Sequence, residues 1–390
     1  MKRTLSQALP RSRTLRPIHL LRTLLAAGIL SMLVGGVWSG LLRMGWALPV
    51  PHQTLALIHG PLFVCGMLGT VIGLERAVAI GRAWAFAAPL LTFLGGAALL
   101  AGVPVGLAAL LISSGSLGLL AIFGTIVRRQ PVRFTITMAL GAVAWFGGNL
   151  FWLSGRPLAL ASLWWAAFLI LTIVGERLEL GRLRHLPRQA WWSFAVGVTL
   201  VPVALVLASV AIDAGIRLAG IGFIVLGAWL LRYDIARRTV RRAGLPRFSA
   251  VCILTGSVWL IVGGTLALVL GAVYAGPIYD ALLHVLFVGF VFSMIFGHAP
   301  IIIPALLNLP VCFHLWHYLP LVVLHLSLLV RIGGDLTGSG DVRRWGGMLN
   351  GLAILLFLLV TAVSIWQGRK HASVVHEPPI DKLTAPELDS

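Results

Sequence analysis

The stretch PLALASLWWAAFLILTIVGE, residues 157–176, decides the fold class. It runs about 20 residues with a single charged side chain, Glu176, at its end, and its polar and apolar positions do not alternate. A helix needs about 20 apolar residues to cross the hydrocarbon core of a membrane, and only helices and closed barrels satisfy their backbone in lipid. The length of the stretch and the missing alternation therefore predict a membrane-spanning helix.

Similar stretches recur along the whole chain. Of its 390 residues, 59% are hydrophobic and only 11% are charged, whereas a soluble domain has about 25% charged residues. We therefore expect an all-α fold, a polytopic membrane helix bundle of about twelve transmembrane helices. The predicted spans are residues 20–42, 54–75, 83–102, 104–127, 134–153, 157–176, 191–212, 215–233, 248–272, 280–303, 315–333 and 346–367.

The distribution of basic residues predicts the orientation. If the chain begins in the cytoplasm, twelve spans place 24 of its 30 Lys and Arg residues inside and six outside. This is the positive-inside pattern, and it predicts that both termini are cytoplasmic. The net charge of +18 is therefore attributed to topology and to contacts with anionic membrane lipids, and no nucleic-acid partner is expected.

Three segments follow from the predicted spans. Residues 1–19 are expected to be a basic cytoplasmic N-terminus, and residues 20–367 a twelve-helix transmembrane domain. Residues 368–390 are expected to be a disordered cytoplasmic tail, because this segment is polar and contains Pro378 and Pro379.

Two histidines lie at matching depths near the outer ends of their spans. His59 follows the start of the second span, and His284 follows the start of the tenth, each by about four or five residues, which is roughly 6–8 Å at 1.5 Å per residue. Two imidazoles at one depth are suited to holding a haem iron from both sides. The alternative is that each histidine forms a hydrogen bond between helices.

Small residues below His59 fit either interpretation. On an α-helix, Gly66, Thr70 and Gly73 would share the face of His59. They would leave room for a flat macrocycle, and we expect Gly66 to line the slot between the histidines. Small residues on such a face also allow two helices to pack closely.

Four further histidines form a second set toward the inner side. His298 ends the tenth span, His314 and His317 begin the eleventh, and His325 is nearer its middle. His298, His314 and His317 could converge on one metal or ring near the cytoplasmic surface, so the set His298, His314, His317 and His325 is a candidate metal site. The alternative is that His314 and His317 are ordinary interfacial residues.

Two acid–base pairs mark inner helix ends. Glu75-Arg76 ends the second span, and Glu176-Arg177 ends the sixth. Ionisable residues in a membrane are costly and often functional, so the carboxylates could handle protons. Ion pairing that anchors the helix ends is the favoured interpretation.

The chain resembles the NnrS family, bacterial twelve-span proteins distantly similar to the main subunit of haem–copper oxidases. The resemblance rests on the twelve-span layout, on His59, and on the tenth-span segment HVLFVGFVFSMIFGH, residues 284–298. It implies a fold like subunit I of those oxidases and a b-type haem held between His59 and His284. It also implies copper as a second cofactor, a link to redox chemistry or the nitric oxide response, and a location in the bacterial cytoplasmic (inner) membrane.

The sequence departs from the oxidase pattern in ways that bear on activity. The sixth and seventh predicted spans contain no histidine, so the usual three-histidine copper site is missing. After His298 and Ala299 the sequence continues as PIIIP, residues 300–304. The family has an Arg-rich segment at this place. We therefore expect a membrane oxidoreductase at most, without a full oxygen- or nitric-oxide-reducing binuclear centre.

The leading hypothesis is a haem-binding integral membrane protein of redox or gas-sensing character. Its partners would be membrane lipids and an electron donor or other membrane subunits. Pro300, Pro304 and Pro310 are expected to interrupt the end of the tenth span. The alternative is a cofactor-free secondary transporter or channel, which twelve spans and interrupted helices would also fit. A third hypothesis is a structural or assembly subunit.

Overall fold

The computed structural model describes residues 15–307 and 309–375, and every regular element within them is helical. Twelve helical segments in this part of the chain are long and apolar enough to cross a membrane, which confirms the predicted all-α bundle and its number of spans. Nine of them are built on one regular helix each: α1 (Leu15–Arg43), α4 (Ala87–Leu100), α5 (Val105–Arg129), α6 (Arg133–Leu153), α7 (Leu158–Leu180), α8 (Arg188–Ala208), α9 (Ile212–Tyr233), α11 (Leu245–Leu270) and α15 (Gly340–Val375).

The second and tenth spans are composite. Each consists of a short α-helix carrying the outer histidine, a π-helix, and a longer α-helix. The second contains α2 (His59–Pro61), η2 (Leu62–Leu68) and α3 (Gly69–Ile80), and the tenth contains α12 (Gly276–His284), η4 (Val285–Phe292) and α13 (Ser293–Leu307). A π-helix is rare and is frequently found at functional sites, and here one follows each outer histidine.

Short elements complete the chain. They are the 3₁₀ turns η1 (Leu55–Leu57), η3 (Ala83–Phe86) and η5 (Leu315–His317), and the one-turn helix α10 (Ala236–Thr239). The eleventh span consists of η5 and the long helix α14 (Tyr318–Thr337). The link that joins α4 to α5 is short. It turns at Gly102, whose φ of +72° is easily reached only by glycine.

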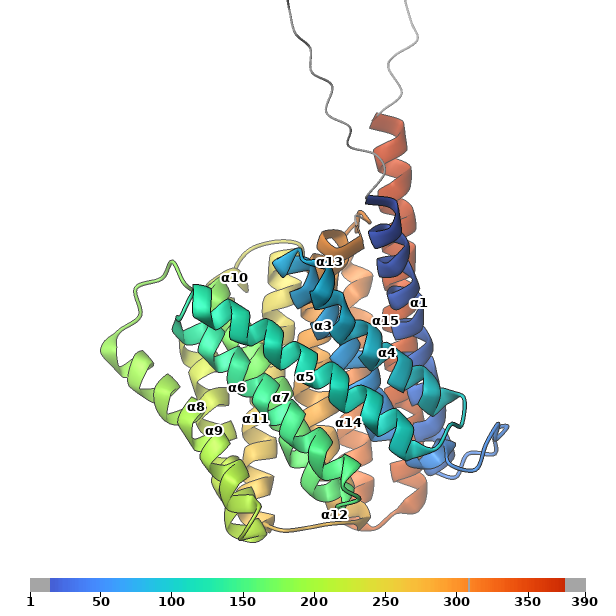
Figure 1. Cartoon of the computed structure of the whole chain (residues 1–390), viewed down its shortest axis with the longest axis vertical. Helices are drawn as coiled ribbons and strands as arrows, with labels where there is room; N and C mark the ends of the chain where they lie inside the picture. Colours follow the sequence, from blue (N-terminus) through green and yellow to red (C-terminus); the bar gives the residue numbers. More distant parts are fainter. Residues whose placement is uncertain (1–14, 308, 376–390) are drawn as a thin grey trace, which may run out of the picture.

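Because the number of spans is even, the first and last helices begin and end at the same end of the bundle. In Figure 1, α1 and α15 lie side by side, and α1 begins at the same end of the bundle at which α15 ends. The helix pairs α6–α7, α8–α9, α9–α11 and α14–α15 pack closely. The second span packs on α1 and α4, while the tenth packs on α11 and α14, so the two histidine-bearing spans lie between different neighbours.

Three details of the predicted boundaries differ from the structure. The α1 helix begins at Leu15, inside the segment expected to precede the first span. The α15 helix runs to Val375, so residues 368–375 continue a helix instead of beginning a disordered tail; residues 376–390 lie outside the described part of the chain. Pro300 and Pro304 do not interrupt the tenth span, because α13 continues past both.

Candidate functional site

His59 is held by the first span. Its Nδ1 lies 2.8 Å from the carbonyl oxygen of Gly36 in α1. A carbonyl can only accept a hydrogen bond, so Nδ1 carries the proton and donates it, which leaves the lone pair on Nε2. Space for the ring is provided by Gly40, where a Cβ atom would lie 2.7 Å from His59 Cε1.

His284 is held in the same way by its own helix. Its Nδ1 donates to the carbonyl oxygen of Asp280, one turn earlier, at 2.8 Å. The Asp280 carboxylate also lies nearby, with Oδ1 3.5 Å from Nδ1, and it accepts two hydrogen bonds from Arg331 of α14 at 2.8 and 3.0 Å. The lone pair of His284 is therefore also on Nε2.

Both rings line one cavity, and the distance between their centres is compatible with a metal held between their nitrogens. Their centroids are 6.2 Å apart and their planes are inclined by 15°. A metal lies about 2 Å from a coordinating imidazole nitrogen, and the centre of a five-membered ring with bonds of about 1.33 Å lies about 1.1 Å behind that nitrogen. One metal between two imidazoles would thus separate the ring centres by about 6.3 Å. Neither Nε2 has a hydrogen-bond partner among the described residues.

Both imidazoles line a cavity of about 230 Å³. Its wall is mainly apolar, as in most cofactor pockets. The wall side chains come from α1, α7, α15 and the two π-helices, and they include Val37, Val64, Trp165, Phe287, Val288 and Ile354. Phe63 and Phe292 also line it, and they pack edge to face with ring centroids 5.6 Å apart, so the histidine-bearing spans touch beside the cavity.

One end of the cavity is cationic. Arg43, Arg331 and Arg343 all line it. Arg331 binds Asp280, and Arg343 lies 2.9 Å from Asp335, which leaves three arginines for two carboxylates. A haem carries two carboxylate groups on one edge, and arginine is the side chain best suited to bind them. Two free imidazole nitrogens, an apolar slot and a cationic end are together the features that a haem requires.

The expectation for Gly66 is wrong. A Cβ atom on Gly66 would meet Met32 and the backbone of Gly96, and one on Gly73 would meet Pro89. These glycines therefore allow α1 and α4 to pack closely on the second span, which was the alternative interpretation. The cause is η2, because a π-helix winds with i→i+5 hydrogen bonds, and residues seven apart no longer share a face.

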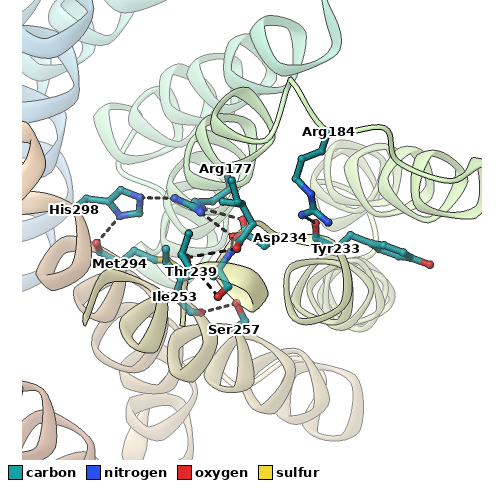
Figure 2. A network of polar contacts seen from close by, with 11 residues as sticks. Arg177, Arg184, Tyr233, Asp234, Thr239, Ile253, Ser257, Met294 and His298 are labelled. Atoms are coloured by element: carbon teal, nitrogen blue, oxygen red, sulfur yellow. Dashed lines mark hydrogen bonds and ion pairs between the residues drawn. The ribbon is translucent and has the colours of Figure 1, made fainter. Parts of the chain in front are cut away.

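Three of the four inner histidines, His298, His317 and His325, have their ring nitrogens engaged by other groups. Trp259 Nε1 donates to His325 Nδ1 at 2.9 Å, and His325 Nε2 donates to Thr255 Oγ1 at 3.1 Å. His298 donates from Nδ1 to the Met294 carbonyl, and its Nε2 faces Arg177 Nη1 at 3.3 Å (Figure 2).

His314 and His317 form a local turn. The Nδ1 of His317 lies 2.9 Å from the carbonyl oxygen of His314, and its Nε2 lies 3.4 Å from Ser364 Oγ in α15. Across residues 15–307 and 309–375, no three His, Cys, Asp or Glu side chains are grouped so as to hold a metal ion. The structure thus brings His59 and His284 together but does not gather His298, His314, His317 and His325.

The acid–base pairs form ion pairs between helices. Arg76 lies 3.1 Å from Glu75 and 2.5 Å from Glu176, so it joins α3 to α7. Arg177 binds Asp234 through two nitrogens at 2.7 and 2.9 Å (Figure 2). These contacts agree with the interpretation that the pairs anchor helix ends.

Sequence reasoning missed the polar support of His284. This support includes Arg331, which is only 7% exposed and lies within α14. Two signals were available. Asp280 stands one helical turn before His284, and Arg331 is an ionisable residue inside a predicted span, which usually has a function.

Comparisons place the chain in a family without assigning its chemistry. Residues 21–366 match the family described as "Domain of unknown function (DUF8744)". This region includes all twelve candidate spans except residues 367–370 at the end of the last one. No curated protein matches the chain.

Proposed function

This chain belongs to the DUF8744 family, and we propose that it is a haem-binding integral membrane protein with His59 and His284 as the two axial ligands. The observation that supports the proposal most is the pair of near-parallel imidazoles, 6.2 Å apart across a cavity. In both rings a backbone carbonyl holds Nδ1. Outer-shell bonds of this kind orient metal-binding histidines and raise their basicity.

Each surrounding group has a separate role in the proposal. The Gly36 carbonyl fixes the tautomer and rotation of His59, and the Asp280 carbonyl does the same for His284. Arg331 neutralises the Asp280 carboxylate beside His284. The apolar wall excludes water, and Arg43 and Arg343 bind the carboxylate edge of the macrocycle.

If His59 and His284 occupied both axial positions of a bound haem, electron transfer would be the favoured chemistry. An iron with two histidine ligands has no open position, and it changes oxidation state with little rearrangement. The chain would therefore accept and release single electrons and would require a redox partner. The resemblance to the NnrS family supports a role in the nitric oxide response in the bacterial cytoplasmic membrane, with both termini inside. We do not extend the proposal to copper, since the inner histidines are not grouped.

The test is the optical spectrum of the full chain purified in detergent after expression with ample haem. Wild type is expected to show the Soret band of a low-spin, six-coordinate haem. His59→Ala and His284→Ala should each abolish the low-spin spectrum, because each opens an axial position. His325→Ala is the matched control, a half-buried histidine whose two ring nitrogens are already used, and it should keep the spectrum.

Two outcomes would contradict the proposal. If wild type bound no haem under these conditions, the cofactor-free transporter or channel would become the better hypothesis. If the outer substitutions left the spectrum unchanged while His298→Ala or His325→Ala removed it, haem binding would stand, but its assignment to His59 and His284 would be wrong.

A further inference from the structure

A second cavity, of about 340 Å³, is lined by arginines. Its five lining residues, from the link between α7 and α8, the end of α9 and the link that contains α10, are Arg184, Arg232, Arg237, Arg238 and Arg241. It lies at the inner ends of α7 and α9, whereas the histidine cavity includes Leu158 at the opposite end of α7. The two sites are therefore separate.

No carboxylate neutralises this arginine cavity. Within the described residues, no ion pair includes any of the five arginines that line it. The nearby acid, Asp234, is buried and fully used, because Arg177 binds it through two nitrogens and the Ala236 N–H donates to it at 2.7 Å.

The arginines are arranged by the backbone around them. Arg184 donates to the carbonyl oxygen of Tyr233 at 2.6 Å, which joins the α7–α8 link to the end of α9 (Figure 2). The guanidinium of Arg232 lies 5.7 Å from the centre of the Tyr233 ring. Arg238 and Arg241 are exposed and make no side-chain hydrogen bond among the contacts of the described residues. Arg237 donates to the carbonyl oxygen of Arg232 at 3.4 Å. The cavity thus has three positioned arginines and two with unused donors.

We infer that this cavity binds an anionic ligand carrying two phosphate groups. Five cations held together repel one another, and a bound anion removes that repulsion. The planar guanidinium matches phosphate oxygens in a two-point contact, and one phosphate cannot use five such groups.

The surroundings favour a phospholipid with two phosphates as the source. Leu183, adjacent to Arg184, is 89% exposed, and Trp192 of α8 is 61% exposed. Tryptophan at the end of a span marks the membrane interface, and the exposed Leu183 offers an apolar contact to acyl chains. Basic pockets beside cytoplasmic span ends suit such head groups.

The experiment measures lipid binding to the full chain in detergent by native mass spectrometry. The probes are a diphosphatidylglycerol lipid, phosphatidylglycerol with one phosphate, phosphatidylcholine, and inorganic pyrophosphate. The pocket variant is Arg238→Gln/Arg241→Gln. The matched control is Arg182→Gln/Arg242→Gln, which removes two equally exposed arginines that do not line the cavity.

Wild type should prefer the two-phosphate lipid to phosphatidylglycerol. The pocket variant should bind it about tenfold or more weakly, since charged hydrogen bonds to phosphate are lost, and the control should stay within about twofold of wild type. Equal losses in both variants, or equal binding of the two anionic lipids, would overturn the inference. Tight binding of pyrophosphate without a preference for the lipid would overturn the assignment to a phospholipid.

Discussion

At the scale of single residues, the proposed function depends on which imidazole nitrogens remain free. The inner histidines His298, His317 and His325 have partners on both ring nitrogens. His59 and His284 have a partner on Nδ1 only. Matching depth in the sequence indicated that these two could pair, but hydrogen-bond partners come from Gly36 and from the local turn, which spacing does not reveal.

Gly40 provides the clearest substitution near the site. An added Cβ would lie 2.7 Å from Cε1 and 2.8 Å from Nδ1 of His59, closer than atoms can approach. Gly40→Ala should therefore turn the imidazole away from its position, and we expect about tenfold weaker haem binding. Haem titration of the apo protein in detergent measures this.

The control for Gly40 is Gly124→Ala in α5. A Cβ at Gly124 meets nothing within 4 Å, so this variant should bind haem as wild type does. If Gly40→Ala also bound haem normally while its fold was intact, the position of His59 would not matter for binding. That result would contradict the proposal that His59 is an axial ligand.

At the scale of elements, the π-helices η2 and η4 separate what the sequence could show from what it could not. Hydropathy alone identified both spans, because burial in lipid depends on composition. The faces within those spans were misjudged, because the i+7 rule that linked His59 to Gly66 assumes an α-helix. A π-helix is selected by packing of neighbouring helices, and a single sequence carries little signal for it.

The ion pair between Arg177 and Asp234 joins α7 to the segment after α9. Its contribution to the free energy of unfolding depends on how deeply the pair is buried. These side chains are 5% and 0% exposed, whereas Arg217 and Asp213 form a similar pair that is 41% and 55% exposed. Asp234→Asn should lower the free energy of unfolding by about 3–5 kcal/mol, because it leaves a buried cation. Asp213→Asn should cost far less, because both partners of this pair are exposed to solvent.

Denaturant titration in detergent compares these two aspartate variants directly. Each substitution is isosteric and removes one carboxylate charge from an Arg–Asp pair. Equal losses of stability in the two variants would mean that burial of the Arg177–Asp234 pair does not determine its contribution, and the proposed anchoring role would fail.

At the scale of the whole molecule, composition predicted most of the architecture. Twelve candidate spans occur where twelve were expected, with boundaries shifted by a few residues. The shifts have local causes. Basic residues Arg369 and Lys370 do not stop α15, because lysine and arginine are good helix formers. What composition could not supply was the cavity, which depends on how six spans meet.

The orientation of the bundle is a prediction of the positive-inside pattern. We expect Arg242→Cys, in the arginine-rich link after α9, to be protected from a membrane-impermeant maleimide added to intact cells. Thr337→Cys, at the end of α14, should react, because an odd number of spans separates the two positions. A Cys312→Ser background removes the one native cysteine that is not buried. Labelling at position 242 and protection at 337 would reverse the orientation.

The central claim is that one iron lies between His59 and His284, and an experimental structure of the haem-loaded chain tests it most directly. We expect a flat macrocycle between the second and tenth spans, with each Nε2 about 2 Å from the iron. The carboxylate edge of the macrocycle should lie toward Arg43, Arg331 and Arg343. Haem density at any other histidine, or an iron bound by neither His59 nor His284, would contradict it.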